Sequence, residues 1–335
     1  MKSLVLTVDK TLVLSESPVP TPLPGESLVS LKASALNHRE IWITKGLYPG
    51  MTLPCILGAD GAGVVTAVGD HSDSEWVGKE VMIYPAFDWG DSEAYSSRKF
   101  RVMGMPDPGT LSEYICVPVS NLVPKPAYLS WEEAAAVPVA GLTAWRALTR
   151  HGNIGAASKV LITGIGGGVA QAGLSLALAS GAEVYVTSSK PDKIKKAMEM
   201  GASGGANYKD PEWPVRIKDQ SSGIDIVLDS SPSANLDDYL KFMNFGGRIV
   251  AYGSTGSPKT TISISRFFLR HIHFIGTTMG SPEEFKALLS FMEKHKLKPL
   301  IEETYPLVDA IKAIEALEQG EHMGKIVLSH RDKAS

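Results

Sequence analysis

Cysteine is scarce in this chain, and neither sign of charge is in excess. Two cysteines, Cys55 and Cys116, occur in 335 residues, which excludes a Cys₄ zinc site and suits a reducing compartment. The formal net charge is −3, so no basic field favours nucleic acid. No apolar run reaches the roughly 18 residues of a membrane span, and the first residues lead into a short alternating segment rather than a signal sequence. We therefore expect a cytoplasmic protein with no membrane or nucleic-acid partner.

The first part of the chain, residues 1–125, contains short strand candidates separated by glycine and proline. Residues 29–35 alternate apolar and polar side chains, as a half-buried strand does. Strands at this spacing predict a small barrel-like β domain. Residues 85–109 have no clear periodicity, and a loop of this length is typical of either a functional lobe or a mobile surface segment.

Strands and helices alternate in residues 126–275, which predicts a doubly wound parallel sheet. Residues 130–133 (Ser-Trp-Glu-Glu) form a capping-box pattern that starts the first helix of this part. From residue 276 the elements are mixed again, and a second capping box at 281–284 starts another helix. We expect residues 276–335 to complete the first domain and to leave a cleft between two lobes.

The most informative segment is 160–182, VLITGIGGGVAQAGLSLALASGA. An apolar β-branched run ends in glycines, and a helical pattern follows, closed by Gly181. Such a turn lets the backbone approach a pyrophosphate at a helix N-terminus. The match to the dinucleotide fingerprint is imperfect, since Ile165, Gly167 and Ala170 stand at its three glycine positions. The alternative is a tight strand–helix turn with no ligand.

Four motifs together resemble the medium-chain dehydrogenase/reductase superfamily over nearly the whole chain. They are residues 58–65 (GADGAGVV), 46–49 (GLYP), 134–148 (AAAVPVAGLTAWRAL) and 167–170 (GGVA). The resemblance implies an α/β protein with a GroES-like β-barrel catalytic domain and a Rossmann domain with a doubly wound parallel sheet. It favours the zinc-free quinone oxidoreductase branch, near the zinc-type alcohol dehydrogenase-like proteins.

The choice between zinc-dependent and zinc-free members depends on a few positions. Zinc members carry Cys where this chain has Asn37, and His-Glu where it has Ala59-Asp60. Ala59 cannot bind a metal and Asn37 is a poor zinc ligand, so we predict no metal site. One alternative is a zinc site shifted along the chain to His38, Glu40 and Asp60. If no metal binds there, His38 and Glu40 are expected to be a solvent-exposed pair on a loop.

Without a metal, only hydrogen-bond donors can stabilise the negative charge that hydride transfer creates. This favours acceptors that delocalise the charge, namely quinones and α,β-unsaturated ketones or aldehydes. Asn37 is predicted to donate to the substrate carbonyl, and Tyr48 to donate or to stack on a flat ring. Trp42 stands where relatives often have an aromatic residue. Core packing is an equal alternative for Trp42 and Tyr48, and water is the expected proton source.

The cofactor is predicted to be NADP(H). An NAD site places an acidic residue at the end of the second strand, and residues 186–190 (VTSSK) contain none. The resemblance implies that Ser188, Lys193 and Tyr208 read the 2′-phosphate, although the lysines of this helix can equally form an exposed face. The further contacts that the resemblance implies are Thr143, Gly167, Gly168, Val169, Gly253, Ser254, Thr255, Thr277 and Lys325.

Two other functions stay open at this point: a zinc-type alcohol dehydrogenase with atypical ligands, and a non-catalytic NADPH-binding protein. The apolar segments 267–269 and 272–275 indicate an edge strand. Members of the family commonly pair such strands, so a homodimer is expected, although simple burial is the alternative.

Overall fold

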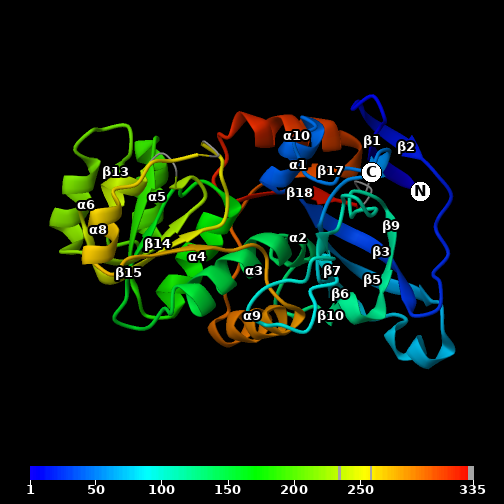
Figure 1. Cartoon of the computed structure of the whole chain (residues 1–335). Helices are drawn as coiled ribbons and strands as arrows, with labels where there is room; N and C mark the ends of the chain where they lie inside the picture. The colour runs from blue at the N-terminus through cyan, green and yellow to red at the C-terminus, as the bar shows by residue number, and fades with distance from the viewer. Residues whose placement is uncertain (233–234, 257–258, 331–335) are drawn as a thin grey trace. The chain divides into compact units, whose positions relative to one another are not determined.

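The computed structural model describes residues 1–232, 235–256 and 259–330. The chain forms two compact units (Figure 1). The first unit consists of Met1–Ala140 and Ser281–Ser335, and the second unit consists of Gly141–Gly280. Residues 126–140, predicted to belong to the second domain, lie in the first unit because the helix α2 (Trp131–Ala135) packs on its strands. Within the described ranges, no helix is both long and apolar enough to cross a bilayer.

The first unit is built on a seven-stranded sheet in the order β10-β6-β5-β3-β18-β17, with β9 also paired to β3. The C-terminal strand β18 (Lys325–Ser329) runs antiparallel to β3 (Glu26–Ala35), so the end of the chain completes this sheet. Its other strands are β5 (Asp60–Val68), β6 (Glu80–Ile83), β9 (Tyr114–Pro118), β10 (Leu122–Pro124) and β17 (Ile301–Pro306).

Smaller elements cover this sheet. A three-stranded sheet has the order β2-β1-β4, and β7 pairs with β8. The remaining elements of the unit are β1 (Lys2–Leu6), β2 (Leu12–Glu16), α1 (His38–Thr44), β4 (Cys55–Ile56), a 3₁₀ turn (His71–Trp76), β7 (Ala86–Phe87), β8 (Arg101–Val102), a 3₁₀ turn (Val119–Asn121), α9 (Pro282–His295), a 3₁₀ turn (Leu307–Asp309) and α10 (Ala310–Gln319).

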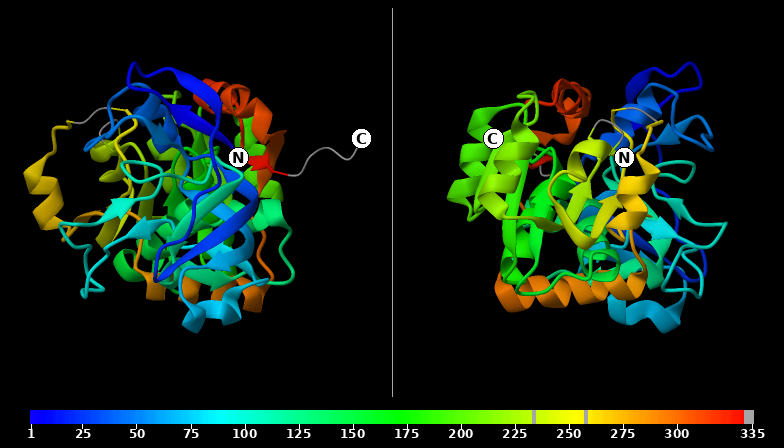
Figure 2. Two further views of the ribbon diagram at one scale, coloured as in Figure 1. Left: turned by 90° about the vertical axis from the view of Figure 1, so that its right-hand side faces the viewer. Right: turned by 60° about the vertical axis from the view of Figure 1, so that its left-hand side comes forward.

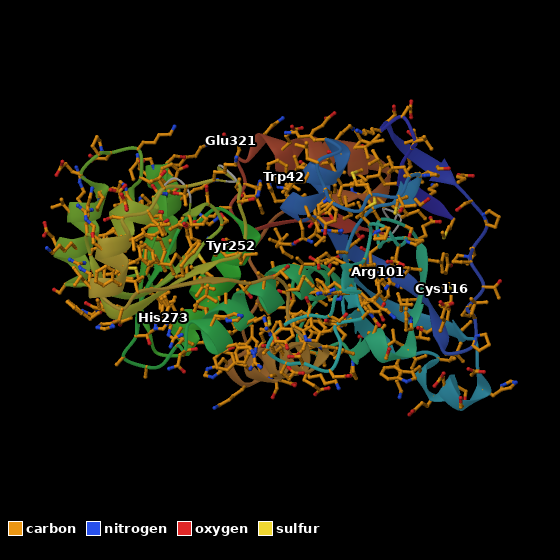
Figure 3. All side chains as sticks on the ribbon, in the orientation of Figure 1. Trp42, Arg101, Cys116, Tyr252, His273 and Glu321 are labelled. Atoms are coloured by element: carbon orange, nitrogen blue, oxygen red, sulfur yellow. The ribbon has the colours of Figure 1, made fainter. Side chains whose placement is uncertain are left out.

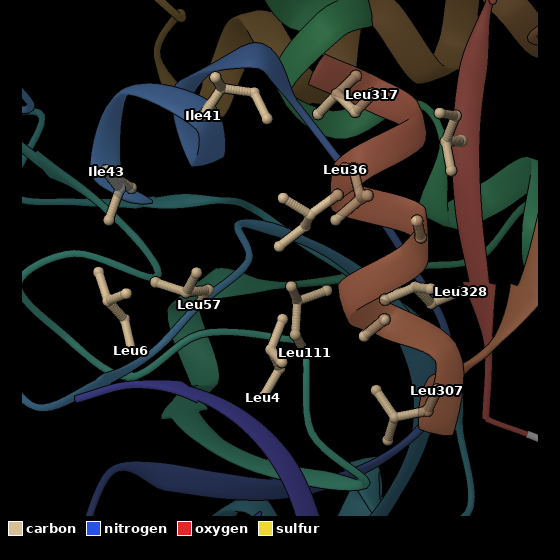
Figure 4. Close-up of a cluster of buried hydrophobic side chains, with 14 of the residues drawn as sticks. Leu4, Leu6, Leu36, Ile41, Ile43, Leu57, Leu111, Leu307, Leu317 and Leu328 are labelled. Carbon is tan, nitrogen blue, oxygen red and sulfur yellow. The ribbon is translucent and has the colours of Figure 1, made fainter. Parts of the chain in front are cut away.

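One apolar cluster ties the two ends of the chain together. Figure 4 shows Leu4 and Leu6 of β1, Leu36 before α1 and Leu317 of α10 around a common centre. All are nearly inaccessible to solvent. Truncating one such leucine to alanine typically costs about 2–5 kcal/mol. The C-terminal return is therefore part of the core on which α1 rests.

Both predicted capping boxes are present. Ser130 Oγ accepts from the backbone N–H of Glu133 at 3.1 Å, and the Glu133 carboxylate accepts from the Ser130 N–H at 2.8 Å. Ser281 and Glu284 make the same reciprocal pair at the start of α9. These bonds satisfy N–H groups that the first turn of a helix leaves without partners.

The 85–109 segment has short strands and contacts of its own. The Arg101 guanidinium bonds the Asp107 carboxylate at 2.6 Å and also pairs with Asp88. Trp89 packs edge-to-face on Phe100. Ion pairs and a ring contact therefore hold together a segment that lacked periodicity in the sequence.

The second unit is a six-stranded parallel sheet in the order β13-β12-β11-β14-β15-β16. In chain order this is 3-2-1-4-5-6, the doubly wound arrangement predicted from the sequence. The strands are β11 (Lys159–Ile162), β12 (Glu183–Ser188), β13 (Gly204–Asn207), β14 (Ile224–Asp229), β15 (Met243–Ala251) and β16 (His273–Gly276).

Helices cover both faces of this sheet (Figures 1 and 2). Leu161 and Val227 pack in a cluster with Trp213, whereas Leu228, which points to the opposite face, lies against Gly173. The helices are α3 (Pro138–Arg146), which contains the boundary between the units, a π-helical turn (Ala147–His151), α4 (Gly168–Ala179), α5 (Pro191–Glu199), α6 (Trp213–Ser221), α7 (Leu236–Tyr239) and α8 (Ile264–Leu269).

Candidate functional site

The second unit has a pocket of about 460 Å³ at the carboxyl ends of its central strands. Residues after β11 and after β14 line it, and these two strands flank the point where the strand order reverses. Doubly wound sheets bind ligands at this switch point. The lining residues are Thr163, Gly164, Thr187, Tyr208, Asp229, Ser230, Ser231, Asn235, Thr255 and Gly256.

The glycine turn beside the pocket leads directly into α4. Gly164 has φ +59°, a left-handed conformation that favours glycine. Gly167 is the N-cap of α4, so the first N–H groups of Gly168, Val169 and the next residue have no acceptor within the helix. A helix end of this kind attracts anionic groups such as phosphate.

A further glycine, Gly173, lies where α4 packs on the sheet. A Cβ on Gly173 would lie 2.6 Å from Leu228 Cδ2 and 3.5 Å from Ile162 Cδ1. Helix α4 therefore approaches β11 and β14 closely because residue 173 has no side chain.

The floor of the pocket contains the Asp229 carboxylate, which the sequence analysis did not select. It accepts from Thr163 Oγ1, from the Ser231 N–H at 2.8 Å and from the Tyr239 hydroxyl. Burial raises the pKa of Tyr239, and the negative charge of Asp229 adds to this effect. Asp229 thus holds the strand ends in place. Its position as the last residue of a buried strand is the signal that could have identified it.

The wall formed by β12 and β13 carries hydroxyl groups. Thr187 and Tyr208 line the pocket, and the Tyr208 N–H donates to the Ser188 carbonyl at 3.2 Å. The Ser188 hydroxyl is buried and accepts from the Lys190 N–H at 3.1 Å. Lys193, on the first turn of α5, is half-buried, whereas Lys195 and Lys196 are exposed. No carboxylate of β12 enters this wall, as the sequence of 186–190 indicated.

The other predicted cofactor contacts are spread through the second unit. Gly253 and Ser254 are exposed beyond β15, and Thr255 lines the pocket with its N–H on the Ser230 carbonyl at 3.0 Å. Thr143 is buried in α3 and does not line the pocket. Thr277 Oγ1 is a buried hydroxyl without a hydrogen-bond partner among the described residues. An orphaned buried hydroxyl is uncommon and fits a group that receives a ligand.

The first unit contains a buried polar cluster formed by Asn37, Asp60 and Lys325. Lys325 Nζ lies 2.6 Å from Asn37 Oδ1 and 3.0 Å from Asp60 Oδ2, and Asn37 Nδ2 lies 2.9 Å from the same Asp60 oxygen. The side chains of Lys325 and Asp60 are 5% and 0% exposed. Asn37 was predicted as a substrate contact and Lys325 as a cofactor contact, and the fold brings the two side chains into direct contact.

Around this cluster, α1 arranges the other predicted substrate residues. Glu40 is fully buried and its carboxylate accepts from the Asn37 N–H at 2.6 Å, so the exposed-loop interpretation of Glu40 is wrong. Burial raises the pKa of Glu40. Trp42 packs edge-to-face on His38 (Figure 3, where Trp42 is labelled). Tyr48 packs against the apolar cluster of Figure 4, which keeps the core-packing alternative open for this residue.

Arg39 was not selected from the sequence. Its side chain is 10% exposed, its Nη1 bonds the Met103 carbonyl at 2.6 Å, and its guanidinium lies 4.8 Å from the centre of the Tyr48 ring. The cation and the ring attract each other in this geometry. Arg39 therefore fixes the position of Tyr48.

The residues of this cluster do not fit a catalytic zinc ion. Such a site needs three protein ligands with free lone pairs. Asp60 Oδ2 already carries the Lys325 ammonium, and Ala59 offers no ligand atom. Cys55 lies buried among backbone carbonyls, and burial raises its thiol pKa to about 11. Within the described part of the chain, no group of three His, Cys, Asp or Glu side chains could hold a metal.

Comparison with known proteins agrees with this architecture. Residues 23–127 match the family model of the alcohol dehydrogenase GroES-like domain, and residues 168–294 match that of the zinc-binding dehydrogenases. The chain is 34% identical to the zinc-type alcohol dehydrogenase-like protein YogA of Leptosphaeria maculans, with 92% of each chain covered. It is 28% identical to the quinone oxidoreductase of Mus musculus, over 94% of this chain and 92% of the relative.

Among solved structures, a crystal structure of an NAD-dependent alcohol dehydrogenase superposes with a TM-score of 0.90 at 34% identity, covering 99% of this chain and 100% of the other. The chain belongs to the medium-chain dehydrogenase/reductase superfamily, with a GroES-like domain and a Rossmann domain. It is an oxidoreductase of that type, and the family uses a nicotinamide cofactor.

Proposed function

We propose that this protein reduces a conjugated carbonyl compound, a quinone or an α,β-unsaturated ketone or aldehyde, with NADPH and without zinc. The observation that carries the proposal is the Lys325 ammonium on Asp60 at 3.0 Å, next to Asn37. Here an amide stands at the position where the zinc branch carries a cysteine, and the ammonium of Lys325 lies against it and against Asp60. Acceptors that spread negative charge over a conjugated system suit a site with hydrogen-bond donors alone.

The NADP(H) preference rests on the wall of the pocket formed by β12 and β13. A 2′-phosphate needs donors and positive charge, whereas a ribose hydroxyl is usually bound by a carboxylate after the second strand. Hydroxyl groups of Thr187, Ser188 and Tyr208 lie on this wall or beside it, and Lys193 follows on α5. The solved structure with a TM-score of 0.90 is of an NAD-dependent enzyme. The NADP(H) preference therefore rests on the residues of this chain alone.

The cofactor, when bound, supplies a hydride. Gly167, Gly168 and Val169 offer backbone N–H groups to its pyrophosphate, Thr255 lies along the pocket, and the unpartnered Thr277 hydroxyl is available to the carboxamide. Hydride addition at the β carbon of an enone moves an electron pair onto the carbonyl oxygen. Asn37 donates to that oxygen, and a proton from water completes the reduction. Tyr48 and Trp42 flank the substrate in this proposal.

Two alternatives have their own support. The family model and the fungal relative carry zinc in their names, which keeps a zinc-type alcohol dehydrogenase with atypical ligands as a candidate. The Asp229 carboxylate in the pocket is fully engaged by Thr163, Ser231 and Tyr239, so it has a structural role there. A pocket whose carboxylate is structural suits a protein that binds NADPH without catalysis.

The deciding experiment measures NADPH and NADH oxidation by the purified protein with quinones, enones, simple ketones and alcohols, together with its metal content. We expect turnover of quinones or enones with NADPH at substoichiometric zinc. Stoichiometric zinc with alcohol oxidation would favour the first alternative. Micromolar NADPH binding without turnover of any compound would favour the second.

We also propose that two copies pair along β16, the last strand in the order of the six-stranded sheet. Its open edge can accept a second strand, and a two-fold axis would join the two sheets. Apolar side chains are exposed on and beside it, at Phe274, Ile264, Phe268 and Leu269 (His273 of this strand is labelled in Figure 3).

Free thiols at Cys55 and Cys116 accord with the cytoplasmic location that we propose.

A further inference from the structure

The amide of Asn37 has two chemically different ends, and its neighbours determine which end points where. Its oxygen faces Lys325 Nζ at 2.6 Å, and an ammonium can only donate. Its nitrogen faces Asp60 Oδ2 at 2.9 Å, and a carboxylate can only accept. A flipped amide would set N–H against N–H at Lys325 and oxygen against oxygen at Asp60. One orientation is therefore imposed by charge.

Lys325 has no hydrogen-bonding capacity left for a substrate. Its three N–H groups are taken by the Leu36 carbonyl at 2.7 Å, by Asn37 Oδ1 and by Asp60 Oδ2. Its effect on a ligand of the first unit must therefore pass through Asn37. The buried Asp60 carboxylate also bonds neighbouring residues: its Oδ1 accepts from the Val139 N–H at 2.8 Å, and its Oδ2 accepts from Asn37 and Lys325.

One group of the cluster remains unused. The Asn37 amide has a second N–H, for which the described residues provide no partner, and Asn37 is partly exposed while Asp60 and Lys325 are buried. The amide oxygen accepts from a cation and its other N–H donates to an anion, and both charge-assisted bonds oppose a flip of the side chain. The free N–H therefore has a fixed direction, which the N–H of an ordinary asparagine does not have.

We propose that Lys325 and Asp60 are positioning residues that lock the Asn37 amide with its N–H toward the substrate oxygen. The proposal rests on the proposed function, since the acceptor is the carbonyl oxygen on which charge develops. A preorganised donor stabilises the transition state more than the ground state. Loss of the lock should therefore lower kcat and leave KM nearly unchanged.

The test exchanges the two side chains in the double variant Asn37→Asp/Asp60→Asn. It keeps one carboxylate, one amide and one ammonium in the cluster, but residue 37 then presents oxygen instead of N–H. We expect kcat with an enone or quinone to fall at least about thirtyfold, with KM within about threefold and an unfolding midpoint near that of the wild type. Lys325→Arg, which retains a donor cation, should keep most of the activity.

A control removes a lysine elsewhere in the same unit. Lys298→Met breaks an exposed ion pair with Glu133 and should leave kcat unchanged. Wild-type kcat in the exchanged double variant would overturn the proposal, because the direction of the residue 37 amide would then not matter. Equal loss in Lys325→Arg and in the exchanged variant would also overturn it.

A second measurement does not depend on turnover. One of the two Nδ2 protons of Asn37 donates to Asp60, and NMR after selective ¹⁵N labelling of asparagine can follow it. In the wild type this proton should exchange slowly with water, and its shift should differ from that of a free asparagine amide. In Asp60→Asn/Lys325→Met it should exchange fast and approach the free value. Fast exchange and free-amide shifts in the wild type would refute the lock. A wild type with a protected Nδ2 proton that reduces no compound of the panel would refute the proposed function alone.

Discussion

The polar cluster of the first unit and the pocket of the second use their polar groups in opposite ways. Asp60 and Lys325 are buried charges that bond each other and their neighbours, and within the described cluster only Asn37 keeps a free N–H. The described residues that line the pocket carry mainly neutral hydroxyl groups and one carboxylate, which is hydrogen-bonded by its neighbours. A buried ion pair orients a single donor rigidly, whereas hydroxyl groups that rotate freely suit the many oxygens of a nucleotide.

The largest effect is expected when the buried ion pair of Asp60 and Lys325 in the first unit is broken. Lys325→Met leaves the Asp60 carboxylate buried without its cation, which should lower the free energy of unfolding by about 3–5 kcal/mol. Urea unfolding monitored by circular dichroism measures this. The double variant Asp60→Asn/Lys325→Met should recover more than half of the loss. If the double variant were as unstable as the single one, the coupling of the two charges would be refuted.

A second prediction is that the stability of the first unit falls at acidic pH. His330 Nε2 lies 2.5 Å from Ser34 Oγ, and burial lowers the pKa of His330 to about 3. The unfolded chain, with a pKa near 6.5, binds this proton more readily than the folded chain does. Stability should therefore fall as the pH drops below about 6.5, by about 2 kcal/mol at pH 5.

The measurement is urea unfolding at pH 5 and pH 7 for the wild type and His330→Gln. The variant should lose most of the difference between the two pH values, because glutamine does not titrate. His273→Gln, at an exposed histidine of β16, should keep the wild-type dependence. An unchanged pH dependence in His330→Gln would show that other groups cause it.

A third prediction sharpens the assignment of the pocket. Lys193→Glu replaces a positive charge near the proposed 2′-phosphate with a negative one, so kcat/KM with NADPH should fall tenfold or more while that with NADH changes little. The matched control is Lys195→Glu on the exposed face of the same helix, where Lys195 pairs weakly with Glu199 at 4.0 Å. Equal use of NADPH and NADH by the wild type would count directly against the phosphate site.

The last prediction concerns the edge strand. Phe274 is 48% exposed, so its remaining apolar surface contributes about 1 kcal/mol in each copy when a second copy covers it. Phe274→Ser removes this contribution from both copies and should therefore weaken the dimer about thirtyfold, as sedimentation equilibrium would measure. Val8→Ser, at a residue that is 72% exposed in the first unit, is the control. A wild type that sediments as a monomer at micromolar concentration would disprove the pairing.

Local patterns in the sequence predicted much of the fold because each depends on neighbours in the chain. The capping boxes at Ser130–Glu133 and Ser281–Glu284 are of this kind. Short strands were also predicted in the first part of the chain, and β1 and β2 are two of them. The helix α1 was missed, because His38–Thr44 is too short for periodicity to be recognised. Gly173 was passed over because its role depends on Leu228 in another strand.

By itself, the sequence determined the order of strands and helices, the missing acid after β12 and the missing metal ligands at residues 37 and 59, since these are statements about residue type and spacing. Only the tertiary structure decided that Lys325 reaches across 288 positions of the chain to Asn37, and that Asp60 holds both. Hydrogen bonds and ion pairs depend on distances of about 3 Å. Such distances between remote residues are fixed by how the strands β3, β5 and β18 are placed in one sheet.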